Sequence, residues 1–319
     1  MRTVWIAIFL ITASSAQAWN GAGHMTVAYI AYNNLNANTR ARVDALLQLN
    51  PMSKQWIAGV PDNQKGLAGF LHAAEWPDCI KSPKECPGKY TDSDGLQGGD
   101  VPKNLPQAAQ NIGYADLFMH KYWHFYDSPY SPNGVPTKDP STPNAATQIP
   151  IFVNALSSNA SDDVKSYDLA WLEHLIGDVH QPLHLVSRFT INFPGGDHGG
   201  NEVKFCSSVN CSENLHSYWD DLLGENKDLA TISRLGNNLF KKGSPQRASE
   251  TSVTVWIAES LALAKQYVYA SPISNEDDPK NKVSPKPDKP YRSNAVSVAE
   301  SQILLAGYRL AETLNRNLQ

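Results

Sequence analysis

Seven long stretches of this 319-residue chain repeat their apolar side chains every three to four residues, which is the spacing of one face of an α-helix. They cover residues 22–35, 39–49, 144–156, 162–186, 212–223, 249–269 and 294–318. Strand signals are few, and the best is Asn201–Cys206, which follows two glycines. Because amphipathic helices must bury their apolar faces against one another, the pattern predicts an all-α protein.

Three polar stretches predict long surface loops. Lys81–Leu105 is rich in Pro, Gly, Lys and Asp, Tyr130–Pro143 has four prolines, and Ser271–Arg292 is charged and Pro-rich. None of them separates two regions of different composition, and the chain has no internal repeat. We therefore expect residues 19–319 to form a single helical domain with long polar loops.

The first 18 residues have the features of a secretory signal peptide. Arg2 supplies a positive charge, Val4–Ala13 is apolar, and Ala16-Gln17-Ala18 fits a cleavage site. A short membrane anchor or a core helix is the alternative, but ten residues of helix span only about 15 Å. Cleavage would leave a free α-amine on Trp19. We expect a secreted or periplasmic monomer without a stable membrane anchor.

Charge and cysteine content narrow the class of protein. A net charge of −4 disfavours a protein that holds duplex DNA by neutralising its phosphates, but it does not exclude an enzyme whose positive charge comes from metal ions. The four cysteines form two close pairs, Cys79/Cys86 and Cys206/Cys211. In an exported protein these pairs favour two short disulfide loops. A four-cysteine zinc site is the alternative, although the chain lacks a C-x₂-C unit.

Histidine and aspartate gather in four clusters. His174 and Asp178 are four residues apart, so a helix would place them on one face, and Pro182 would then let His184 reach a second metal. His216 and Asp220 repeat the spacing, and the other clusters are residues 124–127 and 19–24. One such pair is more often a solvated or capping pair than a metal site. Together the clusters predict a zinc centre, since imidazole and carboxylate are zinc ligands.

The motifs occur in an order that resembles the trinuclear-zinc, single-strand-specific S1/P1 nuclease family. They are an N-terminal Trp with His five residues on, W-x-D, W-H-F, H-x₃-D-x₅-H containing HQPLH, GGN and LH-x₃-D. The motifs run from Trp19 to Asp220, about two thirds of the chain. The resemblance implies a helical fold of the phospholipase C/nuclease type.

The resemblance also implies nine ligands for three zinc ions. These are Trp19, His24, Asp78, His124, His174, Asp178, His184, His216 and Asp220. The α-amine and carbonyl oxygen of Trp19 would hold one zinc together with His24. Asp78, His124 and His174 would hold the second, with Asp178 bridging these two ions. The last three residues would hold the third zinc.

The resemblance implies further roles around these ions. Asp78 would orient or deprotonate the attacking water, and Lys81 would contact phosphate, with a solvated loop lysine as the alternative. Phe125 and Asp127 would bind the base, and Asn201 would help to shape the site or simply close a turn. The implied reaction is hydrolysis of the P–O3′ bond of single-stranded DNA or RNA, which leaves 5′-phosphates, with 3′-nucleotidase activity. Asp221 stands where the family often has a small polar residue, which leaves base preference open.

Two other functions fit parts of the pattern. A zinc phospholipase C has a related three-zinc fold, but its last ligand is typically Glu and its N-terminal Trp is further from the first His. A zinc-storage or zinc-dependent adhesion protein would carry its histidines in flexible tracts rather than at fixed spacing among core aromatics.

Overall fold

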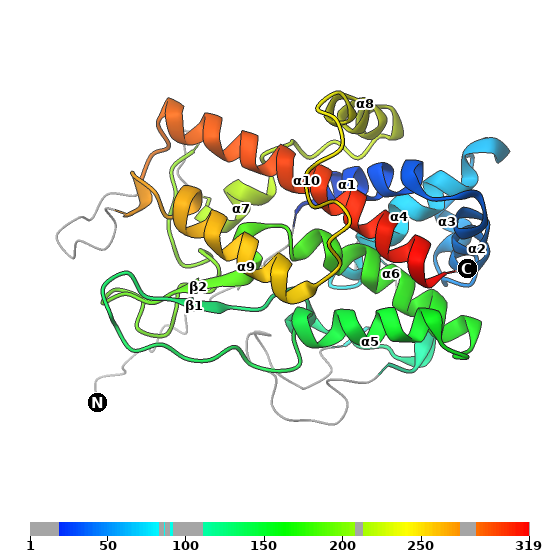
Figure 1. Ribbon diagram of the computed structural model, residues 1–319, viewed down its shortest axis with the longest axis horizontal. Coiled ribbons are helices and arrows are strands. Elements are labelled where there is room, and N and C mark those ends of the chain that lie inside the picture. Colours follow the sequence, from blue (N-terminus) through cyan, green and yellow to red (C-terminus); the bar gives the residue numbers. More distant parts are fainter. Residues whose placement is uncertain are drawn as a thin grey trace, which may run out of the picture.

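The structure is a computed structural model that describes residues 19–82, 86, 90–91, 111–207, 213–274 and 285–318. Helices dominate these residues, and the predicted all-α class is confirmed (Figure 1). The longer helices are α1 (Gly21–Asn34), α2 (Ala37–Leu47), α4 (Lys65–Cys79), α5 (Ala145–Ser157), α6 (Asp162–Asp178), α8 (Leu229–Phe240), α9 (Val253–Leu263) and α10 (Lys289–Asn317). The short helical segments are α3 (Ser53–Trp56), α7 (Leu215–Asp220), η1 (Asp62–Gln64), η3 (Gly113–Ala115), η4 (Lys121–His124), η5 (Pro182–Leu185) and the π-helical η6 (Ala264–Val268).

Two strands of three residues complete the described part of the fold. β1 (Ser128–Tyr130) pairs in parallel with β2 (Val186–Arg188), and Ser128 lies opposite Val186. Because β1 begins shortly after the W-H-F motif and β2 shortly after the HQPLH motif, this pairing brings two of the sequence motifs together.

Asparagine side chains start several of the helices. Asn20 accepts a hydrogen bond from the Gly23 N–H at the start of α1. Asn144 and Asn214 each form a reciprocal capping box with the residue three positions on, at the starts of α5 and α7. Such caps satisfy backbone N–H groups that have no partner within the helix, so they fix where these helices begin, and two of them, α1 and α7, carry predicted ligands.

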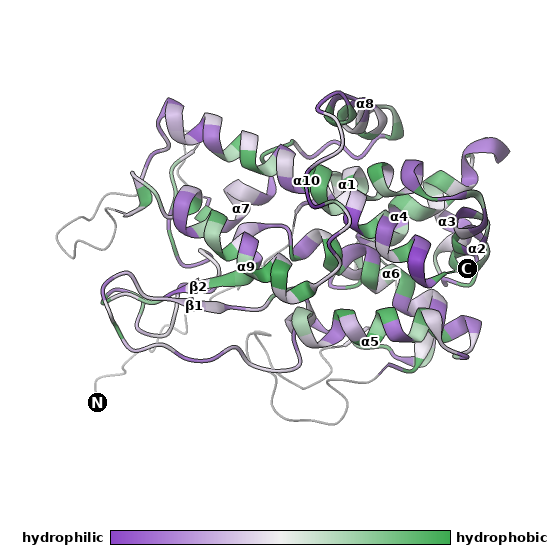
Figure 2. Ribbon diagram, in the orientation of Figure 1, coloured by the Kyte–Doolittle hydropathy of each residue, from purple (hydrophilic) through white to green (hydrophobic). Residues whose placement is uncertain are grey.

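The helix α6 runs through the centre of the molecule. Every one of its residues from Ser166 to Asp178 is buried, and α1 is buried on all sides from Ala22 to Ala31. α1, α4, α5 and α10 pack around α6 (Figure 1). In Figure 2, hydrophobic and hydrophilic residues alternate along α5, α6 and α10. The C-terminal end of α6 is therefore a rigid platform.

Two apolar clusters flank that end of α6. The larger cluster includes Trp76, Trp171 and Ile303, and the smaller one is built around Leu183, Trp219 and neighbouring side chains of η6 and α10. The segment from the end of α6 through η5 passes from one cluster to the other. A polar site at this position is thus walled by packed side chains on both sides.

Several predictions about individual elements are wrong. Asn201–Cys206 forms turns with one isolated bridge, between Lys204 and Asn214, instead of a strand. The helix predicted over 162–186 ends at Asp178, because Pro182 cannot continue it, and η5 and β2 fill the remainder. The loop predicted over 271–292 stops earlier, since α10 begins at Lys289 with Asp288 as its cap.

Two of the longer helices, α4 and α8, were not predicted. Gly66, Gly69 and Pro77 interrupt the apolar pattern of α4, although the helix forms because it packs on α1 and α6. The predicted leader, 1–18, and most of the loop at 81–105 lie outside the described residues. Among those that the structure does describe, no helix has the length and apolar character needed to span a membrane.

One of the two predicted disulfides is present. Cys79 and Cys86 are bonded, with their Cα atoms 5.3 Å apart, which rules out the four-cysteine zinc site. Cys206 is also disulfide-bonded, and its expected partner Cys211 lies outside the described residues.

Candidate metal centre

Eight of the nine residues predicted as ligands come from different elements and gather in three groups near the end of α6. α1 supplies His24, α4 supplies Asp78, η4 supplies His124, α6 supplies His174 and Asp178, η5 supplies His184, and α7 supplies His216 and Asp220. Trp19 lies just ahead of α1. All nine are 5% exposed or less. Ionisable side chains are rarely buried at this density unless they are paired or bind metal.

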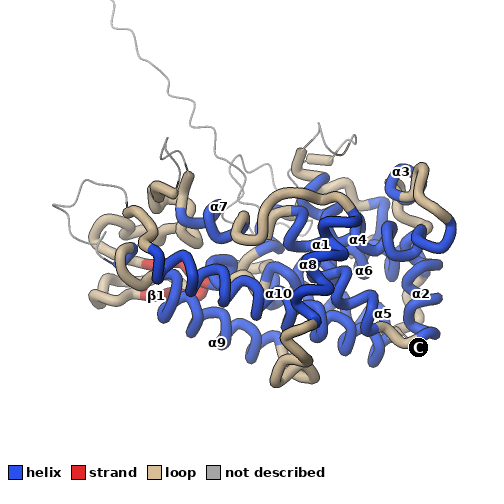
Figure 3. Tube along the Cα trace, turned by 90° about the horizontal axis from the view of Figure 1, so that it is seen from above, coloured by secondary structure: helices blue, strands red, loops and turns tan. Residues whose placement is uncertain are grey.

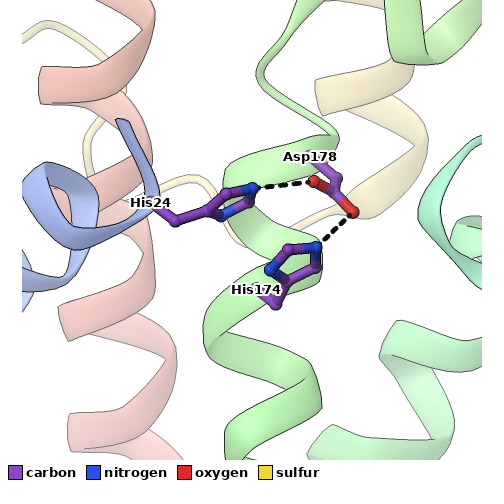
Figure 4. A group of neighbouring side chains, drawn as sticks. All are labelled: His24, His174 and Asp178. Atoms are coloured by element: carbon purple, nitrogen blue, oxygen red, sulfur yellow. Dashed lines mark ion pairs between the residues drawn. The ribbon is translucent and has the colours of Figure 1, made fainter. Parts of the chain in front are cut away.

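A first group joins His24, His174 and Asp178 (Figure 4). Nε2 of His24 lies 3.3 Å from Oδ1 of Asp178, and Nε2 of His174 lies 3.3 Å from Oδ2 of the same carboxylate. The two imidazole rings are stacked, with centroids 3.9 Å apart. Asp178 thus presents one oxygen to each histidine, as expected for a carboxylate between two ions.

A second group joins Asp78, His124 and His174. Nδ1 of His124 lies 2.8 Å from Nε2 of His174 and 3.7 Å from Oδ1 of Asp78. It also lies 3.1 Å from Oδ2 of Asp178. His174 and Asp178 therefore contact both groups, so the two potential metal positions are adjacent.

A third group, His184, His216 and Asp220, is built from η5 and α7. Nε2 of His216 lies 3.1 Å from Nε2 of His184 and 3.5 Å from Oδ2 of Asp220. The other oxygen of Asp220 accepts a hydrogen bond of 2.7 Å from the Gln181 side-chain amide. Gln181 therefore holds Asp220 in its orientation.

Main-chain carbonyl groups fix the protonation of three of these histidines. Nδ1 of His174 donates to the carbonyl of Ala74, that of His184 to the carbonyl of His124, and that of His216 to the carbonyl of Gly199, each at 2.7 Å. With the proton on Nδ1, the Nε2 of each ring carries a lone pair. The lone pairs of His184 and His216 therefore face each other, and a cation between them would turn repulsion into coordination. The donor set fits zinc.

Burial lowers the pKa of three of the histidines in these groups and raises the pKa of two of the aspartates. It lowers the pKa of His124, His174 and His184 well below the ordinary range, so their imidazoles are neutral, which is the metal-binding form. Burial raises the pKa of Asp178 to about 7 and that of Asp220 well above its ordinary range. A neighbouring cation would offset this cost of burying carboxylates.

Lys81 is placed against Asp78. Its Nζ lies 2.5 Å from Oδ1 of Asp78, and its side chain is only 5% exposed, so it is not the solvated loop lysine of the alternative. Burial on its own would raise the pKa of Asp78, but attraction to Lys81 and His174 outweighs it and holds that pKa below its usual range. Asp78 is therefore an ionised carboxylate at neutral pH.

The predicted base-binding residues lie just ahead of β1 in the sequence. Phe125 is partly buried against the larger apolar cluster, and Asp127 has a left-handed backbone with φ of 49°. Asn201 behaves differently, because its amide donates to the carbonyl of His198, three residues earlier, at 2.7 Å. This hydrogen bond closes a turn, which is the alternative role predicted for Asn201.

Several positioning groups escaped the sequence reasoning. A Cβ on Gly177 would lie 2.8 Å from Nδ1 of His24, so this glycine makes room for that ring. Gly199 of the GGN motif, with φ of +65°, supplies the carbonyl for His216. Asp221 accepts a hydrogen bond from Asn20, which ties α7 to the start of α1. Of these groups, only the Gly199-Gly200 pair could have been recognised in the sequence. Every residue has a main-chain carbonyl, so a sequence does not show which carbonyls accept a hydrogen bond from a histidine.

The remaining histidines lie outside the three groups. His180 is buried, donates to the carbonyl of Ile176 and accepts from Arg309 at 2.9 Å. His120 is in a loop but fully buried, stacked on Trp123, and His198 contacts Glu202 at the surface. His72 lies half-buried on α4.

Comparison with known proteins agrees with the geometry. The model of the family described as S1/P1 Nuclease matches residues 19–319. Endonuclease 3 of Arabidopsis thaliana is 26% identical over 98% of this chain and 94% of its own length, and Endonuclease 5 of the same plant is 25% identical over 99% and 96%. Endonuclease 4 is 30% identical over half of this chain. Because the family model covers the whole described fold and the three His/Asp groups, the chain belongs to the S1/P1 nuclease family.

Proposed function

We propose that this nuclease is a zinc-dependent endonuclease that hydrolyses the P–O3′ bonds of single-stranded DNA and RNA, leaves 5′-phosphates, and also acts as a 3′-nucleotidase. The observation that carries the proposal is the donor arrangement at the end of α6. Three buried His/Asp groups adjoin one another, and carbonyl hydrogen bonds turn the lone pairs of two histidines toward each other.

The residues fit three zinc ions. The main-chain amine and carbonyl of Trp19 with His24 would hold the first, Asp78, His124 and His174 the second, and His184, His216 and Asp220 the third. Asp178, with one oxygen toward each neighbouring group, would bridge the first two. When bound, such ions lower the pKa of water and neutralise phosphate oxygens.

Asp78 and Lys81 would divide the remaining chemistry. The ionised Asp78 carboxylate can orient a water and accept its proton as that water attacks phosphorus. Lys81, 2.5 Å from that carboxylate, is positioned to donate to a phosphate oxygen as negative charge develops. Both side chains are nearly buried, so water would not screen these interactions strongly.

Preference for single strands would follow from base binding next to this centre. Phe125 offers an aromatic face that stacks on any base, and the Asp127 carboxylate can accept from an amino or imino edge. Stacking of this kind requires a base that is already free of its duplex neighbours. Asn201 would act at most through the turn that carries the Gly199 carbonyl.

The competing functions are less well supported. Phospholipase C activity is disfavoured by Asp220 in place of Glu, by the five-residue spacing of Trp19 and His24, and by the match to the nuclease family. Storage of zinc is disfavoured because the ligands are rigidly buried in the core.

Processing and location form part of the same proposal. Residues 1–18 would direct export and then be cleaved, which would leave a monomeric domain that begins at Trp19. The free α-amine of Trp19 would then be available as a ligand.

The decisive experiment compares hydrolysis of single-stranded DNA, RNA and phosphatidylcholine by the mature chain before and after zinc is stripped. We expect cleavage of the nucleic acids that disappears on stripping and returns with Zn²⁺. Lipid cleavage alone would favour phospholipase C, and activity that survives stripping would contradict a zinc enzyme.

A further inference from the structure

A cavity of about 360 Å³ lies beside α4, apart from the residues assigned above. Gln55 and Trp56 of α3 line one part of it, His72 and Glu75 of α4 line another, and Lys227 also contributes. The cavity mixes aromatic surface with polar and charged groups, the lining typical of a small-ligand site.

The cavity adjoins two parts of the metal centre. Glu75 precedes Asp78 by three residues on α4, and Cβ atoms at this spacing are about 5–6 Å apart. A Cβ built on Gly21, three residues before His24, would lie 2.5 Å from Oε1 of Glu75 and 2.7 Å from Cδ of Lys227. A strand bound at the metal groups could therefore continue into the cavity.

Two aromatic rings in the cavity are nearly parallel. The rings of Trp56 and His72 lie at 17° to each other, with centroids 6.4 Å apart. Burial lowers the pKa of His72, so its ring is neutral at pH 7 and offers one donor and one acceptor. Flat aromatic faces of this kind stack on bases irrespective of sequence.

Lys227 supplies positive charge beside these rings. It forms an ion pair with Glu75, and the lysine side chain is 46% exposed. The lysine end of this pair faces solvent, whereas Glu75 is only 14% exposed, so the positive charge lies on the side of the pair from which a phosphate would approach. In a chain of net charge −4, such a cation favours the approach of a nucleic acid backbone.

The cavity and the base-binding residues lie on different sides of the metal centre. Figures 1 and 3 both place α3 toward one end of the molecule and β1, which follows Asp127, toward the other, with α7 between them. In Figure 3, α3 and α7 lie along the same side. A strand with one base at Phe125 and its phosphate at the metal groups would thus extend toward α3.

We propose that this cavity is a second nucleotide subsite, which takes a base of the substrate strand against Trp56 and His72 and the adjoining phosphate at Lys227. The inference rests on the nuclease function proposed above. It predicts that longer single strands are better substrates than a dinucleotide, because only longer strands reach the cavity.

The test measures kcat/KM for a deoxyadenosine hexanucleotide and for the dinucleotide, using the zinc-loaded mature chain. The ratio of the two values isolates the cavity, because any damage to the metal centre affects both substrates. The variants are Trp56→Leu and Lys227→Met. Lys65→Met is the matched control, since Lys65, like Lys227, is partly exposed (41%) and pairs with an acidic residue, Asp62.

We expect a wild-type ratio well above one, a roughly tenfold smaller ratio in Trp56→Leu through lost stacking, and a severalfold smaller ratio in Lys227→Met. Lys65→Met should keep the wild-type ratio. The slope of log affinity against log salt for the hexanucleotide should also shrink by about 0.7 in Lys227→Met, which corresponds to one phosphate contact on a single strand.

The outcomes separate the two proposals. A wild-type ratio near one, or an unchanged ratio in Lys227→Met, overturns the subsite while cleavage of the dinucleotide still supports the nuclease. Absence of cleavage of either substrate by the wild type overturns the nuclease function, and the subsite with it. Because Lys227 is exposed, its variant decides the matter even if Trp56→Leu does not fold.

Discussion

At the scale of single residues, the centre depends on groups that position the ligands as much as on the ligands. His24 enters the site only because Gly177 has no side chain, and Asp220 is oriented by the amide of Gln181. Partners of this kind typically change metal affinity 10- to 100-fold when they are altered. Their removal tests the arrangement without deleting a ligand.

Gly177→Ala should lower zinc content and activity. Alanine normally stabilises a helix relative to glycine by about 0.5–1 kcal/mol, but the new Cβ would displace His24. We expect roughly 10- to 100-fold weaker binding of the most labile zinc, measured by competition with a chelator. Gly195→Ala is the control, since nothing lies within 4 Å of its Cβ position. Equal zinc affinity in both variants would contradict the role of Gly177.

Asp168 should make stability depend on pH. Burial raises its pKa to about 8, although a hydrogen bond from Asn111 opposes the shift. The unfolded pKa is near 3.9, so between about pH 4 and pH 8 the folded chain holds a proton that unfolding releases. Stability from this group is therefore lost as pH rises, by at most about 1.4 kcal/mol per pH unit.

Asp168→Asn removes this titration and keeps an acceptor for Asn111. Urea unfolding at pH 5 and pH 8 should show the variant gaining stability over the wild type at the higher pH. A difference between the two proteins that stays constant with pH would show that Asp168 titrates normally.

Four of the candidate ligands were predictable from spacing, because histidine and aspartate at i, i+4 keep that relation on any helix, whereas Trp19 and Asp78 were implied only by the family resemblance. His174 with Asp178 and His216 with Asp220 are both arranged in this way. The carbonyls of Ala74, His124 and Gly199 were not predictable, since every residue has a carbonyl and only the packing of α4, η4 and a turn decides which ones face a ring.

At the scale of elements, the position of α1 against α10 sets the position of His24. Gly307 of α10 allows this close approach, because a Cβ there would lie 2.5 Å from Cβ of Ile30 and 2.9 Å from the carbonyl oxygen of Val27. The start of α10 was misplaced by the sequence reasoning and α4 was missed. Contacts with neighbouring helices stabilise both segments in spite of their weak local patterns.

Gly307→Ala should therefore lower the free energy of unfolding by roughly 1–3 kcal/mol, because the new methyl group overpacks the contact between α1 and α10. At an exposed position in a helix, the same change would instead raise it by about 1 kcal/mol. Thermal unfolding measures the effect. Ser297→Ala, on an exposed position of the same helix, should leave the melting temperature nearly unchanged. A stabilised Gly307→Ala chain would mean that α1 and α10 can separate without cost.

At the scale of the whole molecule, the residues of the three groups are spread over most of the sequence, from His24 to Asp220. The backbone N–H of Asn20 donates to the carbonyl of Asp220, so the start of the described fold lies directly against α7. Ions in the centre would stabilise the folded chain by mass action, since the unfolded chain lacks a formed site.

An extra residue ahead of Trp19 should impair the first two metal positions. It would convert the α-amine into an amide, which is a poor zinc ligand, at a residue that is completely buried. We expect fewer zinc ions per chain, by elemental analysis, and a large loss of nuclease activity compared with a chain that begins at Trp19. Full zinc content in the extended chain would exclude the amine as a ligand.

The carbonyl hydrogen bonds to the three histidines have a consequence for how this centre can vary. A main-chain acceptor does not depend on the identity of the side chain attached to it, so a side chain that packs equally well at position 74 would leave the His174 ring in place, provided that α4 is kept. Gly199 is the exception, because its φ of +65° and the 2.5 Å approach to the carbonyl oxygen of Leu183 exclude other residues. The fold of the main chain, rather than the side chains next to each ring, thus determines that the proton of each of these three histidines is on Nδ1.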